Sequence, residues 1–232
     1  LMWPPSPLQC SAHITENADM DCIIGPANDA PSLAIAAAQL IWDSSPQFLG
    51  YIYADNRARG FKDLQHQWLQ RGGLLSHRHG MLATSQPKPT NEYEILGLSL
   101  SMPGSGMIAQ SEVTGGILSS LATDRILPKF KKRLKAMDYH HPPVPEGAYY
   151  LQNIAVSTEF RGQAIGHRLF QDVLNRAGTA AYTALHLDVI SNNPAVAFYR
   201  RQGMEILSET NLPALWTKDV QPTRYRMVMD IP

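Results

Sequence analysis

Residues 148–170 read AYYLQNIAVSTEFRGQAIGHRLF, and they contain, in order, an apolar run, a short polar loop and a helical pattern. The run 149–156 is rich in apolar residues, which predicts a strand. After Gly166 the apolar residues recur at three- and four-residue spacing, which predicts an amphipathic helix that ends at Gly178. These residues are Leu169, Phe170, Val173, Leu174 and Ala177. The turn 161–166 therefore joins a strand directly to a helix.

A second strand and a second helix follow this unit. Apolar and polar residues alternate over 185–189, which predicts a strand. Because a helix separates the two strands, we expect them to pair in parallel as a βαβ unit. Asn193 is expected to cap a short helix that ends at Gly203, and the segments 204–207 and 225–231 are expected to close the sheet.

The first two thirds of the chain also show the helical spacing and the strand alternation of apolar residues. Helices are expected at 31–43, 62–71, 107–121 and 127–137, and strands at 22–24, 79–84 and 93–102. The fold class expected is therefore α/β, with a mixed, twisted sheet and helices on both faces. Residues 1–19 carry three prolines and no periodicity, so they are interpreted as a loose arm before a single domain at 20–232, in which 103–147 is a long inserted segment.

Composition excludes several classes of protein. The 232 residues include 20 Lys+Arg and 20 Asp+Glu, whereas a broad non-specific nucleic-acid binder carries excess positive charge. The two cysteines and eight histidines show no metal-ligand spacing. The longest apolar-rich run, 33–42, is shorter than the roughly 20 residues of a membrane span. With no signal peptide recognised, we expect a soluble cytoplasmic protein that binds no nucleic acid, membrane or metal.

The turn 161–166 has the features of an anion site. Free N–H groups at a helix start and the positive end of the helix dipole favour a phosphate group. Small residues at 162, 164 and 166 allow a ligand to approach the backbone, and Arg161 adds a charge. The Gly-Lys-Ser/Thr ending of a Walker loop is missing. A dinucleotide fingerprint needs three glycines, and only Gly162 and Gly166 are present, although Asp188 follows Gly166 at a spacing suited to a ribose-binding acid. A coenzyme A loop is the third alternative.

The chain resembles the Gcn5-related N-acetyltransferases (GNAT family) at this turn. Arg161-x-x-Ala-x-Gly166 is similar to the family's Gln/Arg-x-x-Gly-x-Gly/Ala loop. The segment from Asn193 to Met204 is similar to the family's Asn-x-x-Ala-x-x-x-Tyr-x-x-x-Gly-Phe segment, with Met204 in place of the usual aromatic residue. The close resemblance covers about residues 148–207, which would form the cofactor-binding core.

The resemblance implies an acyl-CoA N-acyltransferase fold whose central parallel strands splay apart near Val156 and Ile190, with the thioester in the gap. Ile154, Ala155 and Val156 would pair their backbone with the pantetheine arm of acetyl-CoA, and an N–H beside Val156 would stabilise an oxyanion. Asn193 would contact that arm or order the next helix. The pyrophosphate would be held by the loop residues Arg161, Gly162, Gln163, Ala164, Ile165 and Gly166.

Ala164 departs from the family pattern, which usually has glycine at this position. Two outcomes are open: the extra methyl group crowds the phosphates, or it fits because φ is negative there.

Tyr199 is the candidate catalytic residue that the resemblance implies. Thioester aminolysis expels a thiolate, and a phenol with a pKa of about 10 can protonate a thiolate whose thiol has a pKa of about 8.5. The alternative is that Phe198 and Tyr199 are core aromatics of an amphipathic helix. No general base is assigned, since Tyr150 and Gln152, which are expected to face the reaction centre, are poor bases.

The predicted function is direct transfer of the acetyl group of acetyl-CoA to a primary amine of a small molecule or peptide. A non-catalytic acyl-CoA-binding sensor or interaction module is the alternative, and a nicotinamide-dependent oxidoreductase is a third. The helices before residue 75 and the segment 103–147 are expected to wall the acceptor site, although the latter can equally cover the interface of a homodimer. The acceptor itself stays open.

Overall fold

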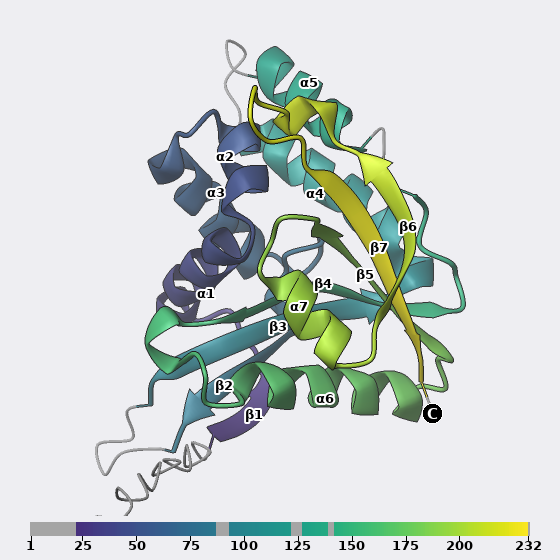
Figure 1. The fold of residues 1–232 in the computed structure, drawn as a ribbon. Helices are drawn as coiled ribbons and strands as arrows, with labels where there is room; N and C mark the ends of the chain where they lie inside the picture. Colours follow the sequence, from purple (N-terminus) through teal and green to yellow (C-terminus); the bar gives the residue numbers. More distant parts are fainter. Residues whose placement is uncertain (1–21, 87–92, 122–126, 139–141, 232) are drawn as a thin grey trace, which may run out of the picture.

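The computed structural model describes residues 22–86, 93–121, 127–138 and 142–231 (Figure 1). The expected N-terminal arm at 1–19 and most of the expected turn at 86–91 lie outside these residues. None of the helices in the described ranges is both long enough and apolar enough to cross a lipid bilayer.

A seven-stranded sheet forms the centre of the described structure, with the strand order β1-β2-β3-β4-β5-β7-β6. The strands are β1 (Cys22–Pro26), β2 (Gly80–Ser85), β3 (Ile95–Pro103), β4 (Ala148–Val156), β5 (Ala184–Ile190), β6 (Glu205–Asn211) and β7 (Thr223–Asp230). Neighbouring strands are antiparallel except β4 and β5, which are parallel. The mixed sheet and the βαβ unit expected from the sequence are therefore confirmed.

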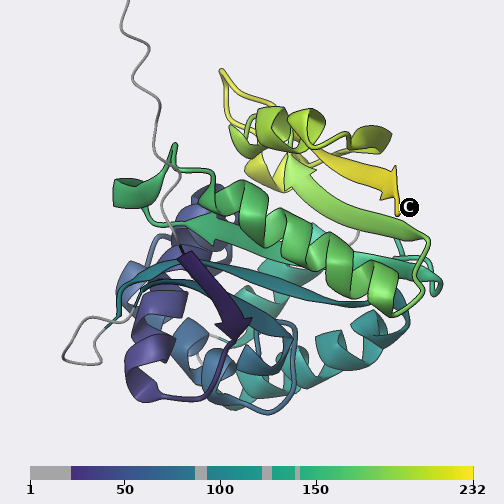
Figure 2. The same ribbon diagram turned by 90° about the horizontal axis from the view of Figure 1, so that it is seen from below.

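Helices cover both faces of this sheet. They are α1 (Pro31–Ser44), α2 (Pro46–Tyr53), α3 (Arg57–Leu69), α4 (Met107–Leu121), α5 (Leu127–Asp138), α6 (Ile165–Thr179) and α7 (Ala195–Arg201). Figure 2 shows α6 along one face and α1 with the helices that follow it on the other. The apolar stripe expected for α6 is buried, because Leu169, Phe170 and Val173 are fully covered and belong to the core on this face.

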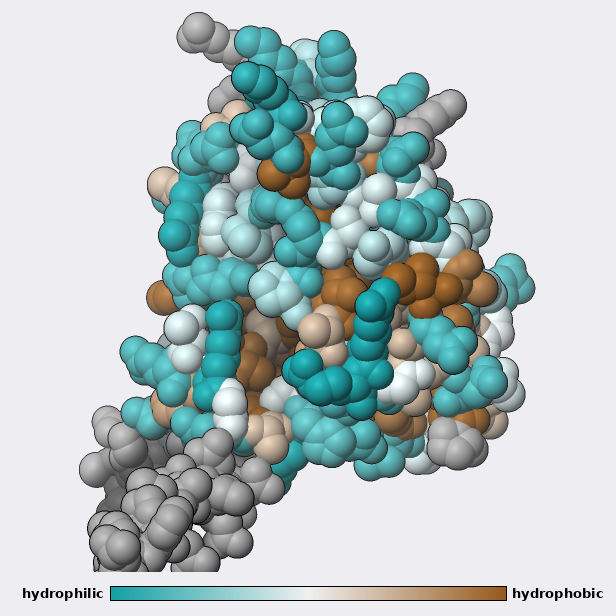
Figure 3. Space-filling model, viewed as in Figure 1, coloured by the Kyte–Doolittle hydropathy of each residue, from teal (hydrophilic) through white to brown (hydrophobic). Residues whose placement is uncertain are grey.

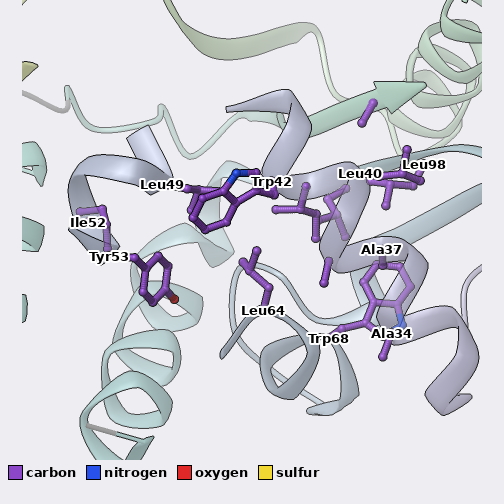
Figure 4. Close-up of a cluster of buried hydrophobic side chains, with 14 of the residues drawn as sticks. Ala34, Ala37, Leu40, Trp42, Leu49, Ile52, Tyr53, Leu64, Trp68 and Leu98 are labelled. Carbon is purple, nitrogen blue, oxygen red and sulfur yellow. The ribbon is translucent and has the colours of Figure 1, made fainter. Parts of the chain in front are cut away.

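The core on the opposite face is built mainly by α1, α2 and α3. Figure 4 shows Trp42, Leu49, Leu64 and Trp68 gathered there, with Leu98 of β3 on the sheet side. Burial of several large apolar side chains, each worth about 1.5–3 kcal/mol, holds these helices to the sheet. The junction of α1 and α2 is thereby fixed above β4.

Helix α2 was not predicted from the sequence. Its residues PQFLGYIY carry aromatic and β-branched side chains around Gly50, which intrinsic propensity does not favour in a helix. Pro46 suits the first helical turn, and Leu49, Ile52 and Tyr53 are buried against the neighbouring helices. Tertiary burial therefore overrides local propensity here.

The central strands β4 and β5 pair over only four residues. The register runs from Ala148 and Ala184 to Leu151 and Leu187, after which β4 continues beside β3 and β5 continues beside β7. Gln152 has no partner in the β3 ladder, so β4 carries a bulge at this level. A bulge bends and twists its strand, which accounts for the separation of the two strands. The splayed parallel strands expected from the resemblance are therefore confirmed.

Candidate active site

A cleft of about 630 Å³ opens where β4 and β5 separate. One wall is the end of β4, where Ile154, Ala155 and Val156 line the cleft, and Ile190 of β5 lies opposite. The main chain of β4 beyond Leu151 pairs with β3 on one side and with no described strand on the other. Its polar groups are therefore available to a ligand in the cleft.

The second wall comes from α7 and the turn before it. Pro194, Ala195, Phe198 and Arg201 line the cleft, a spacing that places them on one side of the helix. In Figure 3 an apolar hollow lies between hydrophilic rims on the face that carries α7.

The junction of α1 and α2 closes one end of the cleft with residues 43–47. Two asparagines tie this junction to the sheet. Asn153 Nδ2 donates to Ser44 Oγ at 2.8 Å, and Asn193 Nδ2 donates to the Ser44 carbonyl at 3.1 Å. Asn193 Oδ1 accepts from the N–H of Ala195 at 2.9 Å, so the same side chain orders the start of α7. Asn193 also lines the cleft.

The start of α6 forms the other end of the site. Its first helical hydrogen bond runs from Arg168 N to Ala164 O at 3.0 Å, so the earlier N–H groups of the first turn have no partner within the helix. Ala164, the N-cap residue, provides no side-chain cap, whereas a Ser or Asp there would occupy one of these donors. Arg161 and Gly166 line the cleft beside this helix start.

Two residues of the turn adopt left-handed backbone conformations. Gly162 has φ +82° and Ala164 has φ +56°. The negative φ considered for Ala164 is therefore wrong. A left-handed conformation costs a residue with a Cβ atom roughly 1–2 kcal/mol. Successive N–H groups in such a turn form a concave surface that can bind an anion. The conformational preference of alanine does not predict this backbone conformation.

Gly166 lines the cleft between Val156 of β4 and Phe198 of α7. A Cβ atom at this residue would lie 3.6 Å from Val156 Cγ2 and 3.7 Å from Phe198 Cε2, which is ordinary van der Waals contact. Gly166 is therefore close to both walls. The apolar walls and the N–H groups without partners inside the helix suit a ligand with an apolar stretch and an anionic end.

Not every residue expected in the site lines the cleft. Ile154, Ala155, Val156, Arg161, Gly166 and Asn193 line it, whereas Gly162, Gln163, Ala164, Ile165 and Tyr199 do not. The first four of the latter form the turn that begins α6, with the side chain of Ile165 buried among apolar residues. Arg201 and residues 43–47 line the cleft although they were not expected there, and Arg201 follows Phe198 at helical spacing.

The side chain of Tyr199 packs into the core on the α6 face. It is 7% exposed, and its ring centroid lies 6.5 Å from that of Phe170 and 5.4 Å from that of Phe198. Burial raises the pKa of the Tyr199 phenol above its ordinary value, so this group is neutral near pH 7.

Charge is divided between the two ends of the cleft. Arg161 and Arg201 are the cations among its lining residues, and Asp43 is the only carboxylate there in the described part of the chain. Arg161 Nε donates to the Val156 carbonyl at 3.3 Å, which leaves its terminal nitrogens for other acceptors. Asp43 pairs at 3.5 Å with Arg57, which is exposed. Within the described residues, no group of three His, Cys, Asp or Glu side chains could hold a metal ion.

One part of the chain matches a known protein family. The family model described as "Acetyltransferase (GNAT) family" matches residues 112–204. The resemblance to the GNAT family that the turn and the helix at Asn193 indicated is therefore confirmed for this part of the chain. No curated protein matches the sequence of this chain.

Solved structures show the same fold. An N-acetyltransferase from Staphylococcus aureus Mu50 is 13% identical, with a TM-score of 0.64, and the match covers 89% of this chain and 100% of that one. A Bacillus subtilis acetyltransferase in complex with CoA is 11% identical, with a TM-score of 0.52 and coverage of 91% and 100%. Arabidopsis thaliana NAA60 in complex with a bisubstrate analogue is 17% identical, with a TM-score of 0.51 and coverage of 91% and 100%.

Proposed function

We propose that this protein is an N-acetyltransferase that transfers the acetyl group of acetyl-CoA directly to a primary amine. The observation that carries the proposal is the position of the cleft. It lies between two parallel strands that stop pairing, and it leads to a helix start that has no side-chain cap. The substrate supplies an acyl group already activated as a thioester, so the protein has to bind, orient and manage protons.

The main chain of β4 is proposed to bind the pantetheine arm. Residues 154–156 present amide groups on the side that β5 has left, as a sheet edge does for an added strand. The apolar side chains of Ile154 and Val156 and the ring of Phe198 exclude water along this stretch.

The beginning of α6 is proposed to bind the diphosphate. The N–H groups of 162–166 converge at the positive end of the helix dipole, where an anion is stabilised. Arg161 is next to these groups and lines the cleft.

Arg201 is proposed as a second cationic contact at this end. His167 Nδ1 lies 2.7 Å from Gln202 Oε1, so the last turn of α7 lies beside the first turn of α6. The opposite end of α7 lies at the α1–α2 junction, through Asn193. The cleft therefore has a phosphate end near Arg161 and Arg201, and an acyl end near Ile190 and Asn193.

The acceptor amine is proposed to enter at the α1–α2 junction. Asp43 places a negative charge there, which attracts an ammonium group. Asp43 is partly exposed and paired with Arg57, so it is proposed to attract the amine and not to deprotonate it. The lining residues in the described ranges offer no histidine, and the amine is expected to lose its proton to water.

Tyr199 is proposed as the general acid that protonates the leaving thiolate. Its raised pKa keeps the proton on the phenol at neutral pH, which a donor requires, although it also makes the phenol a weaker acid. The burial of its ring against Phe170 fixes its orientation.

A thiol-release assay with acetyl-CoA and a panel of amines tests the proposal. Mass spectrometry of the acceptor should show addition of one acetyl group for each thiol released. Thiol release without acceptor acetylation, or no release above the uncatalysed rate with any amine, would contradict acetyl transfer.

A non-catalytic acyl-CoA-binding module is the second candidate. Two observations favour it: the phenol of Tyr199 belongs to a packed core, and no histidine lines the described cleft. Isothermal titration separates the candidates, since the module binds coenzyme A while turning over no amine.

A further inference from the structure

A buried side-chain network lies at the level where β4 and β5 stop pairing. Tyr150 Oη donates to Asp188 Oδ2 at 2.7 Å. Tyr150 lies one residue before the last pair of the parallel ladder, Leu151 and Leu187, and Asp188 lies one residue after it. The hydrogen bond therefore crosses diagonally from one strand to the other at the point where the two strands stop pairing.

Arg226 of β7 holds the carboxylate of Asp188 in a forked contact. Its Nε lies 2.9 Å from Asp188 Oδ1, and its Nη2 lies 2.8 Å from Asp188 Oδ2. The same guanidinium donates to the carbonyls of Pro142 and Pro143, at 2.6 and 3.1 Å. Arg226 is 2% exposed and Tyr150 3% exposed, so water does not screen these contacts.

The register of the sheet places these groups on one face. Asp188 and Arg226 are directly opposite in the antiparallel ladder of β5 and β7. Successive side chains of a strand point to opposite faces, so Tyr150 and Tyr149 point apart. The hydroxyl of Tyr149 accepts from Arg176 of α6 at 3.3 Å, which places Tyr149 on the α6 face and Tyr150 on the other. Burial raises the pKa of the Tyr150 phenol, so this hydroxyl stays protonated and donates.

These contacts add a side-chain connection between the two strands at the end of their ladder. Within a ladder, backbone hydrogen bonds hold neighbouring strands about 4.8 Å apart. Beyond Leu151 no such bond joins β4 to β5, and the bulge at Gln152 turns β4 away. The Tyr150–Asp188 bond, held in place by Arg226, is then a side-chain contact between the two strands just before they separate.

We infer that Tyr150, Asp188 and Arg226 form a clamp that sets the width of the gap at its acyl end, so that Tyr150 is a positioning residue for the thioester and limits the size of the acyl group. The inference rests on the proposed acyl transfer, since it concerns the group that occupies the gap. The clamp does not touch the phosphate end of the cleft, where Arg161 and Arg201 lie.

Tyr150→Phe tests the clamp, with Tyr149→Phe as its matched control. Each change removes one buried, hydrogen-bonded hydroxyl from adjacent residues of the same strand. The readout is the ratio of kcat/KM for propionyl-CoA to that for acetyl-CoA, measured beside the melting temperature. A purely structural loss lowers the melting temperature in both variants and leaves this ratio unchanged.

The clamp predicts that Tyr150→Phe raises the propionyl-to-acetyl ratio at least threefold, whereas Tyr149→Phe keeps it within 1.5-fold of the wild type. Arg226→Lys, which keeps the charge but gives up the forked contact, is expected to shift the ratio in the same direction. An unchanged ratio in Tyr150→Phe, or in Arg226→Lys if Tyr150→Phe does not fold, would overturn the clamp and leave acetyl transfer standing. A wild-type chain that binds coenzyme A but transfers neither acyl group would overturn the proposed function as well.

Discussion

Replacing Arg201 by glutamine tests the assignment of the phosphate end of the cleft. Arg201 lines the cleft in the last turn of α7, whereas the adjacent Arg200 is exposed and does not line it. Arg200→Gln is therefore a matched control with the same charge change on the same helix. We expect Arg201→Gln to weaken coenzyme A binding and Arg200→Gln to leave it within twofold.

The size of the effect follows from the exposure of Arg201. A hydrogen bond to a charged group contributes about 1.5–3 kcal/mol when it is well formed. Arg201 is exposed, so solvent screening reduces this to about 0.5–1 kcal/mol. At 1.4 kcal/mol for each factor of ten, the dissociation constant should rise roughly two- to fivefold.

Isothermal titration with coenzyme A at low salt measures this difference. Pantetheine, which lacks the nucleotide phosphates, should bind the wild type and Arg201→Gln alike. Near 1 M salt, where charges are screened beyond about 3 Å, the difference should shrink. Equal coenzyme A affinities for Arg201→Gln and Arg200→Gln at low salt would refute the placement of a phosphate beside Arg201.

Four further changes probe the turn, the proposed acid and the sheet. Tyr199→Phe should lower kcat about 100-fold or more, as loss of a general acid does, while the affinity for coenzyme A stays within a few-fold of that of the wild type. Unchanged turnover, measured as thiol release by stopped flow, would show that Tyr199 is not the general acid. Gly162→Val places a branched residue at φ +82°, where its Cβ atom has no neighbour within 4 Å. Calorimetry should therefore find a folded protein, while titration should find coenzyme A binding at least tenfold weaker. Equal coenzyme A binding would count against the assignment of the diphosphate to this turn. Ala164→Gly removes the backbone strain of an alanine in the left-handed conformation and should raise the free energy of unfolding by about 0.5–1 kcal/mol in urea titrations. A lower free energy of unfolding would contradict the presence of this strain. Burial lowers the pKa of His186 in the folded protein, so the unfolded chain binds a proton more readily. The contribution of His186 to the free energy of unfolding should therefore be complete above about pH 6.5 and should be lost as the pH falls through the lowered pKa of the folded state. His186→Gln should reduce this loss of stability at low pH, and a reduction no larger than that in His66→Gln, a change at an exposed residue, would argue against a role of His186.

Local patterns in the sequence predicted the central part of the fold. The turn 161–166 and the helices at Leu169 and Asn193 rest on short-range signals, such as helical spacing and a capping side chain, and each has its expected place. The parallel pairing of β4 and β5 followed from the single helix between them.

Features that depend on distant residues were not predicted. The clamp joins Tyr150 to Asp188 and Asp188 to Arg226, and each pair is 38 residues apart in the chain. The register that brings them together depends on the bulge in β4, which no local pattern reveals. From the sequence, Asp188 was therefore considered only as a ribose-binding acid, whereas in the structure its carboxylate accepts hydrogen bonds from Arg226.

Some parts of the site could have been predicted from local sequence patterns, and others could not. The helical spacing of Phe198 and Arg201 already places both on one side of α7, so Arg201 could have been found from the sequence. The role of the α1–α2 junction could not, since it depends on the bonds from Asn153 and Asn193 to Ser44. The φ of Ala164 is set by the turn that must begin α6, and alanine gives no signal of it.

A crystal structure of the full chain with acetyl-CoA would show directly whether the cleft between β4 and β5 binds this cofactor. We expect electron density for the pantetheine arm along residues 154–156, with the diphosphate on the N–H groups of 162–166 and the thioester in the gap between β4 and β5. Density for the nucleotide at another place, with side chains closing the gap, would contradict it.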